Sequence, residues 1–188
     1  MPPKVKITKD NIIRTTVDLV RKSGEEAINA RAIAKALDSS TQPIFSNFES
    51  MEELEKETLT ATYKIYLDFI SREVESGKHP KYKAFGMAYV RFANEEPELF
   101  KLLFMRDRRG MELITTHDFD ASIEMIMESS NISRESATLM HLEMWTSVHG
   151  IATMLATSFL SLEWELISDI LTDVYQGLRK RHLSEENK

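Results

Sequence analysis

Apolar residues recur every three or four positions along almost the whole chain, the spacing that places them on one face of an α-helix. The first group, which includes Ile12, Val17 and Val20, is preceded by Thr8, a favourable N-cap, and followed by Gly24, a favourable helix end. This group predicts a helix over residues 9–23. No segment alternates apolar and polar residues in the manner of strands joined by hairpins, so we predict an all-α fold.

The same spacing predicts further helices, about nine in all. Favourable N-caps stand before several of them, at Asn29, Asp118, Ser133 and Ser161. The segment MRDRRG, residues 105–110, is typical of a loop. The remaining expected helices span residues 30–37, 41–47, 51–77, 81–94, 97–105, 119–128, 134–159 and 162–182.

Residues 30–48, ARAIAKALDSSTQPIFSNF, carry the most informative pattern. A short apolar helix is followed by a polar turn at residues 38–40 and by a second short helix. We expect Ile44, Phe45 and Phe48 of the second helix to face back onto the first. Two short crossed helices are typical of a helix-turn-helix, whose second helix enters the major groove of DNA. DNA is therefore the leading candidate ligand.

The net charge of −6 does not favour DNA binding, but the charge is unevenly distributed. Residues 1–50 contain eight Lys and Arg against six Asp and Glu, so they carry +2 and the remainder carries −8. Because salt screens charges beyond about 8–10 Å, a mildly basic front end can still bind phosphate locally. The alternative is an acidic protein whose surface charge is simply uneven.

Composition argues against catalysis. The absence of cysteine excludes disulfides, thiolate metal sites and a cysteine nucleophile. The histidines form no HExxH or Glu-x-x-His pair, and there is no glycine-rich phosphate loop or G-x-S-x-G elbow. We therefore predict no enzyme, no catalytic residues, no cofactor and no metal site. MPPKVKITKD lacks the apolar core of a signal peptide, and residues 144–160 resemble a buried helix, so we expect a cytoplasmic protein without a membrane span.

These residues resemble the TetR family of transcriptional regulators. The resemblance covers the helix that ends at Gly24, INARAIAKAL at 28–37, SSTQPIFSNF at 39–48 and S-x-EEL at 50–54, where Ser50 and Glu53 form the pattern of a capping box. PELFKLLF at 97–104 and WTSVHG at 145–150 are similar to the carboxy-terminal domain of a TetR subgroup with a Trp…His-Gly signature. The resemblance implies an all-helical homodimer, joined through its last two helices, with a small-molecule pocket in each subunit.

We accordingly expect two domains. Residues 1–50 would form a three-helix, helix-turn-helix DNA-binding domain, and residues 51–188 a helical effector-binding and dimerisation domain. The long helix that follows Ser50 suits a connector between them.

The chain departs from the family pattern at three positions. The family usually has tyrosine at Phe45, histidine at Asn47 and lysine at Met51, and these side chains typically touch DNA phosphates. Each missing phosphate cation flattens the salt dependence of binding by about one unit of log–log slope. We therefore predict weaker and less salt-sensitive binding than in a typical member. The usual turn glycine is also absent, so Asp38 or Ser39 must adopt the turn geometry.

Gln42 is the best candidate for direct base readout, because glutamine can pair with adenine through two hydrogen bonds. The alternative is a solvent-exposed glutamine. Thr41 and Pro43 can touch a thymine methyl, although Thr41 can equally be an N-cap, and for Arg31 a phosphate contact and a structural role are both open. Lys9, with Lys4 and Lys6, belongs either to an arm that enters the minor groove or to a solvated leader. The DNA-binding candidates are Arg31, Ser40, Thr41, Gln42, Pro43, Phe45, Ser46 and Asn47.

Trp145 and His149, four residues apart, share a helical face and can contact a ligand, or they can form an ordinary hydrogen-bonded core. Eight of the ten methionines fall between Met87 and Met154, and flexible thioethers suit either an adaptable apolar pocket or plain core. The ligand-binding candidates are Phe85, Phe92, Phe104, Met125, His141, Trp145 and His149.

We therefore expect a homodimeric, ligand-responsive transcriptional regulator. It would be a repressor that binds a near-palindromic DNA operator and is released by a small apolar or amphipathic effector. The alternative is a helical dimer that acts as a protein-interaction adaptor, with a front end that no longer reads DNA.

Overall fold

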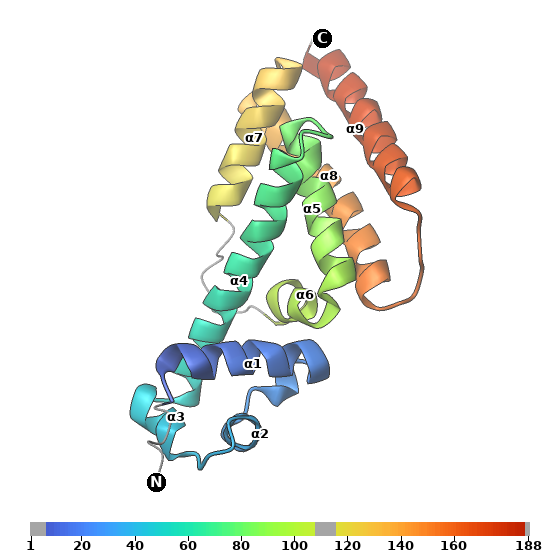
Figure 1. Ribbon diagram of the computed structural model, residues 1–188. Helices are drawn as coiled ribbons and strands as arrows, with labels where there is room; N and C mark the ends of the chain where they lie inside the picture. The colour runs from blue at the N-terminus through green and yellow to red at the C-terminus, as the bar shows by residue number, and fades with distance from the viewer. Residues whose placement is uncertain (1–6, 108–115, 187–188) are drawn as a thin grey trace. The chain divides into compact units, whose positions relative to one another are not determined.

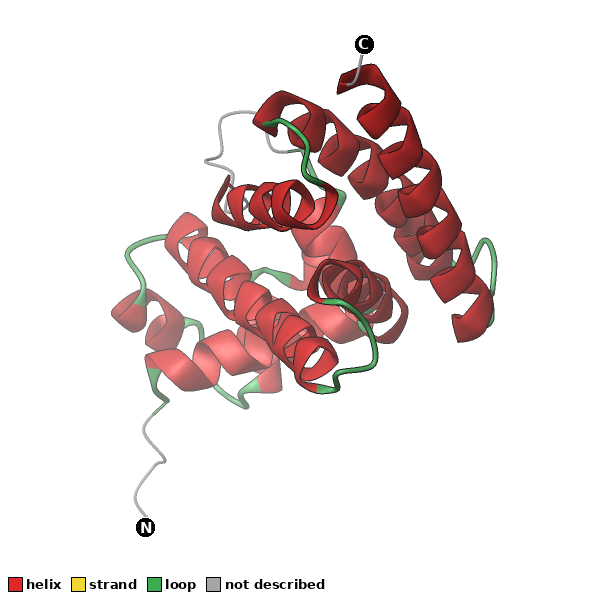
Figure 2. Cartoon of the chain, turned by 90° about the horizontal axis from the view of Figure 1, so that it is seen from above, coloured by secondary structure: helices red, strands yellow, loops and turns green. Residues whose placement is uncertain are grey.

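The computed structural model describes residues 7–107 and 116–186, and within them nine α-helices and one 3₁₀ turn but no strand (Figures 1 and 2). The predicted all-α fold is confirmed. No helix of these described ranges is long and apolar enough to cross a membrane. The helices are α1 (Lys9–Ser23), η1 (Glu25–Ala27), α2 (Ala30–Ala36), α3 (Gln42–Asn47), α4 (Met51–Glu75), α5 (Lys81–Glu95), α6 (Pro97–Phe104), α7 (Thr116–Ser130), α8 (Arg134–Ala156) and α9 (Trp164–Glu186).

Helix starts follow local hydrogen bonding where a polar cap is present. The side chain of Thr8 accepts from the amide of Asn11, that of Asn29 from Ala32, and that of Ser133 from Ser136. Each bond satisfies an amide that has no partner within its helix. These three predicted caps are confirmed.

Two predicted caps and two helix ends are wrong. Helix α9 continues to Glu186 rather than ending near His182. Asp118 lies inside α7, which begins at Thr116, and Ser161 lies three residues before α9 begins at Trp164. Helix α8 ends at Ala156 rather than at residue 159, because Ser158 has a φ of +55° and a helix cannot continue through that conformation. Of the predicted loop at 105–110, residues 105–107 follow α6 without helix, and the rest lie outside the described residues.

The chain folds as two compact units. The first contains Met1–Leu67 and Glu96–Arg106, and the second contains Asp68–Glu95 and Asp107–Lys188, so the single helix α4 contributes to both. The predicted domain division at residue 50 lies immediately before α4 begins, and it stays a prediction.

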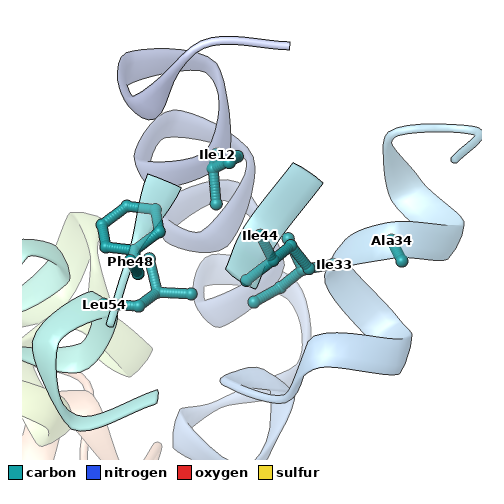
Figure 3. Close-up of a cluster of buried hydrophobic side chains, with 6 residues drawn as sticks. All are labelled: Ile12, Ile33, Ala34, Ile44, Phe48 and Leu54. Carbon is teal, nitrogen blue, oxygen red and sulfur yellow. The ribbon is translucent and has the colours of Figure 1, made fainter. Parts of the chain in front are cut away.

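The first unit is built around a small apolar cluster that joins α1 to α4 (Figure 3). Helix α6 packs on α1, and Arg21 of α1 forms an ion pair with Glu96, Nε to Oε2 at 2.9 Å. The cluster consists of Ile12, Ile33, Ala34, Ile44, Phe48 and Leu54.

The second unit is centred on α8, against which α5, α7 and α9 all pack (Figure 1). Gly86 of α5 permits close packing there, because a Cβ at this position would meet Val148 at 3.4 Å and Leu171 at 3.7 Å. Phe92, Met87, Met140 and Ile167 are fully buried.

Candidate DNA-binding surface and ligand-binding residues

The turn between α2 and α3 is closed by a residue in the left-handed region. Asp38 has a φ of +48°, and the amide of Ser39 donates to the carbonyl of Ala34 at 2.9 Å. Aspartate tolerates this conformation better than most residues other than glycine and asparagine. The prediction that Asp38 or Ser39 adopts the turn geometry is confirmed at Asp38.

Helix α3 is held by one face and presents the other to solvent. Ile44 and Phe48, four residues apart, are buried in the apolar cluster (Figure 3). Phe45 was expected to face inward with them, and that prediction is wrong, because its side chain is 55% exposed. One residue beyond Ile44 is a rotation of about 100° around the helix, which carries Phe45 out of the core. Gln42 and Ser46 are exposed on the same side.

The polar candidates on and beside α3 bond locally. The hydroxyl of Ser46 donates to the carbonyl of Gln42 at 2.9 Å, and the amide of Asn47 donates to the carbonyl of Pro43 at 2.7 Å. Thr41 immediately precedes α3, yet its side chain makes no capping hydrogen bond. Ser40 is exposed. Contact with DNA would require Ser46 and Asn47 to exchange these bonds for phosphate.

Arg31 lies exposed in the first turn of α2, whereas Lys9 is engaged inside the first unit. The ammonium group of Lys9 donates to Glu53 at 3.0 Å and to Glu57 at 3.1 Å, and it lies 5.0 Å from the centre of the Phe48 ring. These hydrogen bonds to Glu53 and Glu57 raise the pKa of Lys9. Lys9 therefore fastens α1 to the start of α4 and belongs to no arm. Lys4 and Lys6 lie outside the described residues.

Glu53 also orders the entry to α4. Ser50 Oγ accepts from the Glu53 amide at 3.2 Å, as a capping box requires. The Glu53 carboxylate, however, accepts from the amide of Glu49 at 2.7 Å, one residue before the expected partner. That bond, with the one from Lys9, lowers the pKa of Glu53.

In the second unit, two tyrosines of α5 each bond a histidine of α8. Tyr82 Oη lies 2.9 Å from Nδ1 of His141, and Tyr89 Oη lies 2.8 Å from Nδ1 of His149. Burial lowers the pKa of His141 to about 4 and also lowers that of His149, so both rings are neutral at pH 7. Burial raises the pKa of Tyr82.

These pairs belong to a continuous aromatic ladder. His149 stacks on Trp145, with ring centroids 5.2 Å apart, and the ring of Phe119 from α7 meets His141 edge-on at 4.7 Å. The spacing of four along α8 places His141, Trp145 and His149 on one face. The aromatic ladder is formed by Tyr82, Tyr89, Phe119, His141, Trp145 and His149.

The comparisons with known proteins agree with this architecture. A family model described as the tetracycline repressor-like, C-terminal domain matches residues 82–175, which is 94 of the 188 residues. The chain belongs to the TetR family. The crystal structure of a TetR-like transcriptional regulator from Rhodococcus sp. RHA1 is 13% identical, covers 98% of each chain and superposes with a TM-score of 0.67, which shows a shared fold. No curated protein matches.

The part matched by the TetR model contains the whole aromatic ladder but not the helix-turn-helix. The structure brings three of the predicted ligand residues, His141, Trp145 and His149, into this ladder. Sequence reasoning missed the two tyrosines, whose only signal is their spacing of seven on α5, and Phe119. Their partners lie about 60 residues away in the chain, so no local pattern pairs them.

The other four predicted ligand residues of this TetR protein have differing surroundings. Phe92 is fully buried and its ring lies 5.4 Å from that of Phe69. Phe104 belongs to the first unit, where its ring meets that of Tyr66 edge-on at 5.3 Å. Phe85 and Met125 are half-buried.

A separate recess of about 240 Å³ opens where α4 and α5 of the second unit meet, and none of the predicted ligand residues lines it. Glu73 is its most buried charged group, with a side chain that is 8% exposed. Its Oε2 accepts from Arg91 Nε at 3.0 Å, while Oε1 has no hydrogen-bond partner among the described residues. The lining residues are Phe69, Arg72, Glu73, Arg91 and Glu95.

Proposed function

We propose that this TetR-family protein is a non-enzymatic, ligand-responsive transcriptional regulator of the cytoplasm, a repressor that binds a near-palindromic operator as a homodimer. The observation that carries the proposal is the two-sided character of α3. Ile44 fixes one side in the core, and Gln42, Phe45 and Ser46 stand exposed on the other. A recognition helix needs this arrangement, because it must be rigidly held while its outer face meets base edges.

In the complex, Gln42 would contact bases, because it occupies the first turn of α3, and the amino-terminal residues of a recognition helix reach the base edges. Contacts with DNA phosphates would position the first unit on the duplex, and they would come from Ser40, Thr41, Ser46, Asn47 and Arg31. Pro43, half-buried at the second position of α3, would pack beside the groove.

The last two helices would supply the dimer interface. Leu139 and Leu142 of α8 and Leu166 of α9 are exposed at 48%, 42% and 47%. Gly150 and Gly177 have open space where a Cβ would stand. Exposed leucines beside small residues suit close contact with the same surface of a second subunit.

The effector would bind beside the aromatic ladder, where neutral imidazoles and an indole form an apolar face with a few hydrogen-bonding groups. The small apolar or amphipathic effector expected from the sequence matches that chemistry. Helix α4 runs without interruption from the first unit into the second, so a shift of its carboxy-terminal end would move the first unit. Half-sites lie about 34 Å apart, and a few ångströms of misfit would lose several DNA contacts.

The decisive experiment measures binding of the purified protein to DNA that flanks its own gene, with Gln42→Ala as the matched variant. We expect a saturable, sequence-specific complex with the wild type and a loss of discrimination, rather than of folding, in the variant. Equal affinity for random duplexes at low salt would refute the proposal.

A second candidate function is a protein-interaction adaptor that has lost DNA reading. The exposed ring of Phe45 favours it, since large apolar side chains at a surface often mark protein contacts. A dimer without sequence preference for DNA would support the adaptor.

A further inference from the structure

The exposed face of α3 combines an amide and an aromatic ring and contains no charge. The helix reads QPIFSN, and its outer side presents Gln42 and, one turn later, Phe45. The ring is 55% exposed, whereas the neighbouring apolar residues Ile44 and Phe48 are almost completely buried. Packing within the described residues of the first unit therefore does not explain an aromatic residue at this position.

Base chemistry restricts what such a face can read. Guanine is read most often by arginine or lysine, through its O6 and N7 acceptors, and α3 offers neither residue. The side chain of Gln42 pairs best with adenine. A phenyl ring cannot bond a phosphate, and the main apolar group on the floor of the major groove is the 5-methyl group of thymine.

We infer that α3 reads A·T base pairs and that Phe45 is a specificity-determining residue, which packs its ring on a thymine methyl beside the adenine bound by Gln42. Residues three apart on a helix are neighbours on one face, so the two side chains address adjacent base pairs. The inference rests on the proposed function and adds to it which base pairs α3 recognises.

The free protein is consistent with this role. Ser46, the other exposed side chain of the face, bonds back to the Gln42 carbonyl at 2.9 Å and leaves the ring as the most prominent group there. Hydrophobic burial of one methyl group is worth about 0.8 kcal/mol, or about fourfold in affinity per contact. Because a dimer makes the contact twice, loss of both methyl groups multiplies the two losses of affinity.

The test begins with selection of bound sequences from a random duplex pool by the wild-type protein. The enriched duplex is then synthesised with uracil in place of each thymine in turn, symmetrically in both half-sites. Uracil lacks only the methyl group. We expect one thymine position at which uracil weakens binding about tenfold or more across the dimer, and we expect that penalty to vanish in Phe45→Ala.

Two further variants make the result specific. Phe45→Tyr keeps the ring and should keep the uracil penalty, and Gln42→Ala should lose adenine preference while keeping the penalty. Thermal unfolding of Phe45→Ala is expected to match the wild type, because the ring is exposed. An enriched site without a uracil-sensitive thymine, or a penalty that persists in Phe45→Ala, overturns the inference alone. A pool that yields no enriched sequence overturns the proposed function as well.

Discussion

The imidazole of His149 stacks on the indole of Trp145, with 5.2 Å between ring centroids and 21° between ring planes. Tyr89 fixes the same imidazole from the other helix by a hydrogen bond at its Nδ1. One turn earlier than Trp145, His141 repeats the arrangement with Tyr82 and Phe119. Burial lowers the pKa of both histidines and keeps them neutral at pH 7, and this has a measurable consequence for stability.

Stability should fall with acid because of His141. Burial lowers its pKa from the ordinary 6.5 to about 4 in the folded protein. Between these values the unfolded chain binds a proton that the folded protein does not, so the free energy of unfolding decreases as the pH falls from 6.5 to 4, by up to about 3 kcal/mol. Above pH 6.5 this group contributes no slope.

The measurement is urea unfolding between pH 4 and 8, for the wild type and for His141→Gln, whose amide can still bond Tyr82 but does not titrate. The variant should show a shallower pH dependence, and the difference isolates His141 from the other histidines. An NMR titration that places the pKa of His141 near 6.5 would contradict the account.

The Glu73–Arg91 ion pair yields a second prediction. Glu73 has an 8% exposed side chain, and Arg91 also lies over the ring of Trp164 at 4.5 Å. Arg91→Met would leave a buried carboxylate without its cation and should destabilise the protein by about 3 kcal/mol. Arg72→Met, an exposed arginine at the same recess, should cost less than about 1 kcal/mol. Thermal and urea unfolding compare the two, and equal losses would show that the buried pair has no special weight.

The sequence predicted the fold well because most helix boundaries are local. A capping side chain at Asn29 or Ser133, or a proline at Pro97, acts within one turn of its helix. The failures occurred at Asp118 and Ser161, where a favourable capping residue stands near a helix whose start is set elsewhere.

The candidate sites were harder to predict, for two reasons. Phe45 is apolar and next to a core residue, yet helix rotation rather than hydropathy decides its exposure. The ladder pairs Tyr82 with His141 across the contact of two helices, and a single sequence carries no signal for such a pair. Helical spacing could place Trp145 and His149 on one face, but it could not reveal their aromatic neighbours.

The turn at Asp38 should tolerate glycine and reject β-branched residues. With a φ of +48°, Asp38 pays a conformational cost of about 1 kcal/mol that glycine avoids, although glycine loses more entropy on folding. Asp38→Gly is therefore expected to be neutral or to stabilise by about 0.5 kcal/mol, and Asp38→Val to destabilise by more than about 1 kcal/mol. Lys35→Gly, inside α2, should instead cost about 1 kcal/mol. A destabilised Asp38→Gly in thermal unfolding would exclude strain at this turn.

The proposed dimer predicts a size-dependent effect at Gly150. Apart from its chain neighbours and the adjacent backbone of α8, no described atom lies within 4 Å of a Cβ at this position, so Gly150→Leu should leave the subunit fold intact. In a dimer joined through α8, the added side chain would separate the two helices. We expect sedimentation velocity to show dimers for the wild type and monomers for Gly150→Leu, with unchanged helix content. Glu124→Leu, which adds similar bulk at an exposed position of α7, should remain dimeric. If Gly150→Leu also stays dimeric, α8 does not form the interface as proposed.

Salt dependence tests two of the three positions at which this chain departs from the family pattern, Phe45 and Met51. Met51 packs against the apolar cluster of the first unit, and Phe45 is exposed, so neither supplies a cation to DNA. The wild-type slope of log affinity against log salt should therefore be shallower than the value of about 7 that eight phosphate contacts would give.

Met51→Lys should steepen this slope by about 0.9 per subunit, nearly 2 for a dimer, because two more counterions are released. Phe45→Tyr adds a neutral hydroxyl and no cation, so it should leave the slope unchanged. A fluorescence-anisotropy titration between 50 and 300 mM salt (about sixfold in concentration) measures all three proteins. A wild-type slope of 7 or steeper would mean that other cations replace the missing lysine, and an unchanged slope in Met51→Lys would place the start of α4 away from the phosphates.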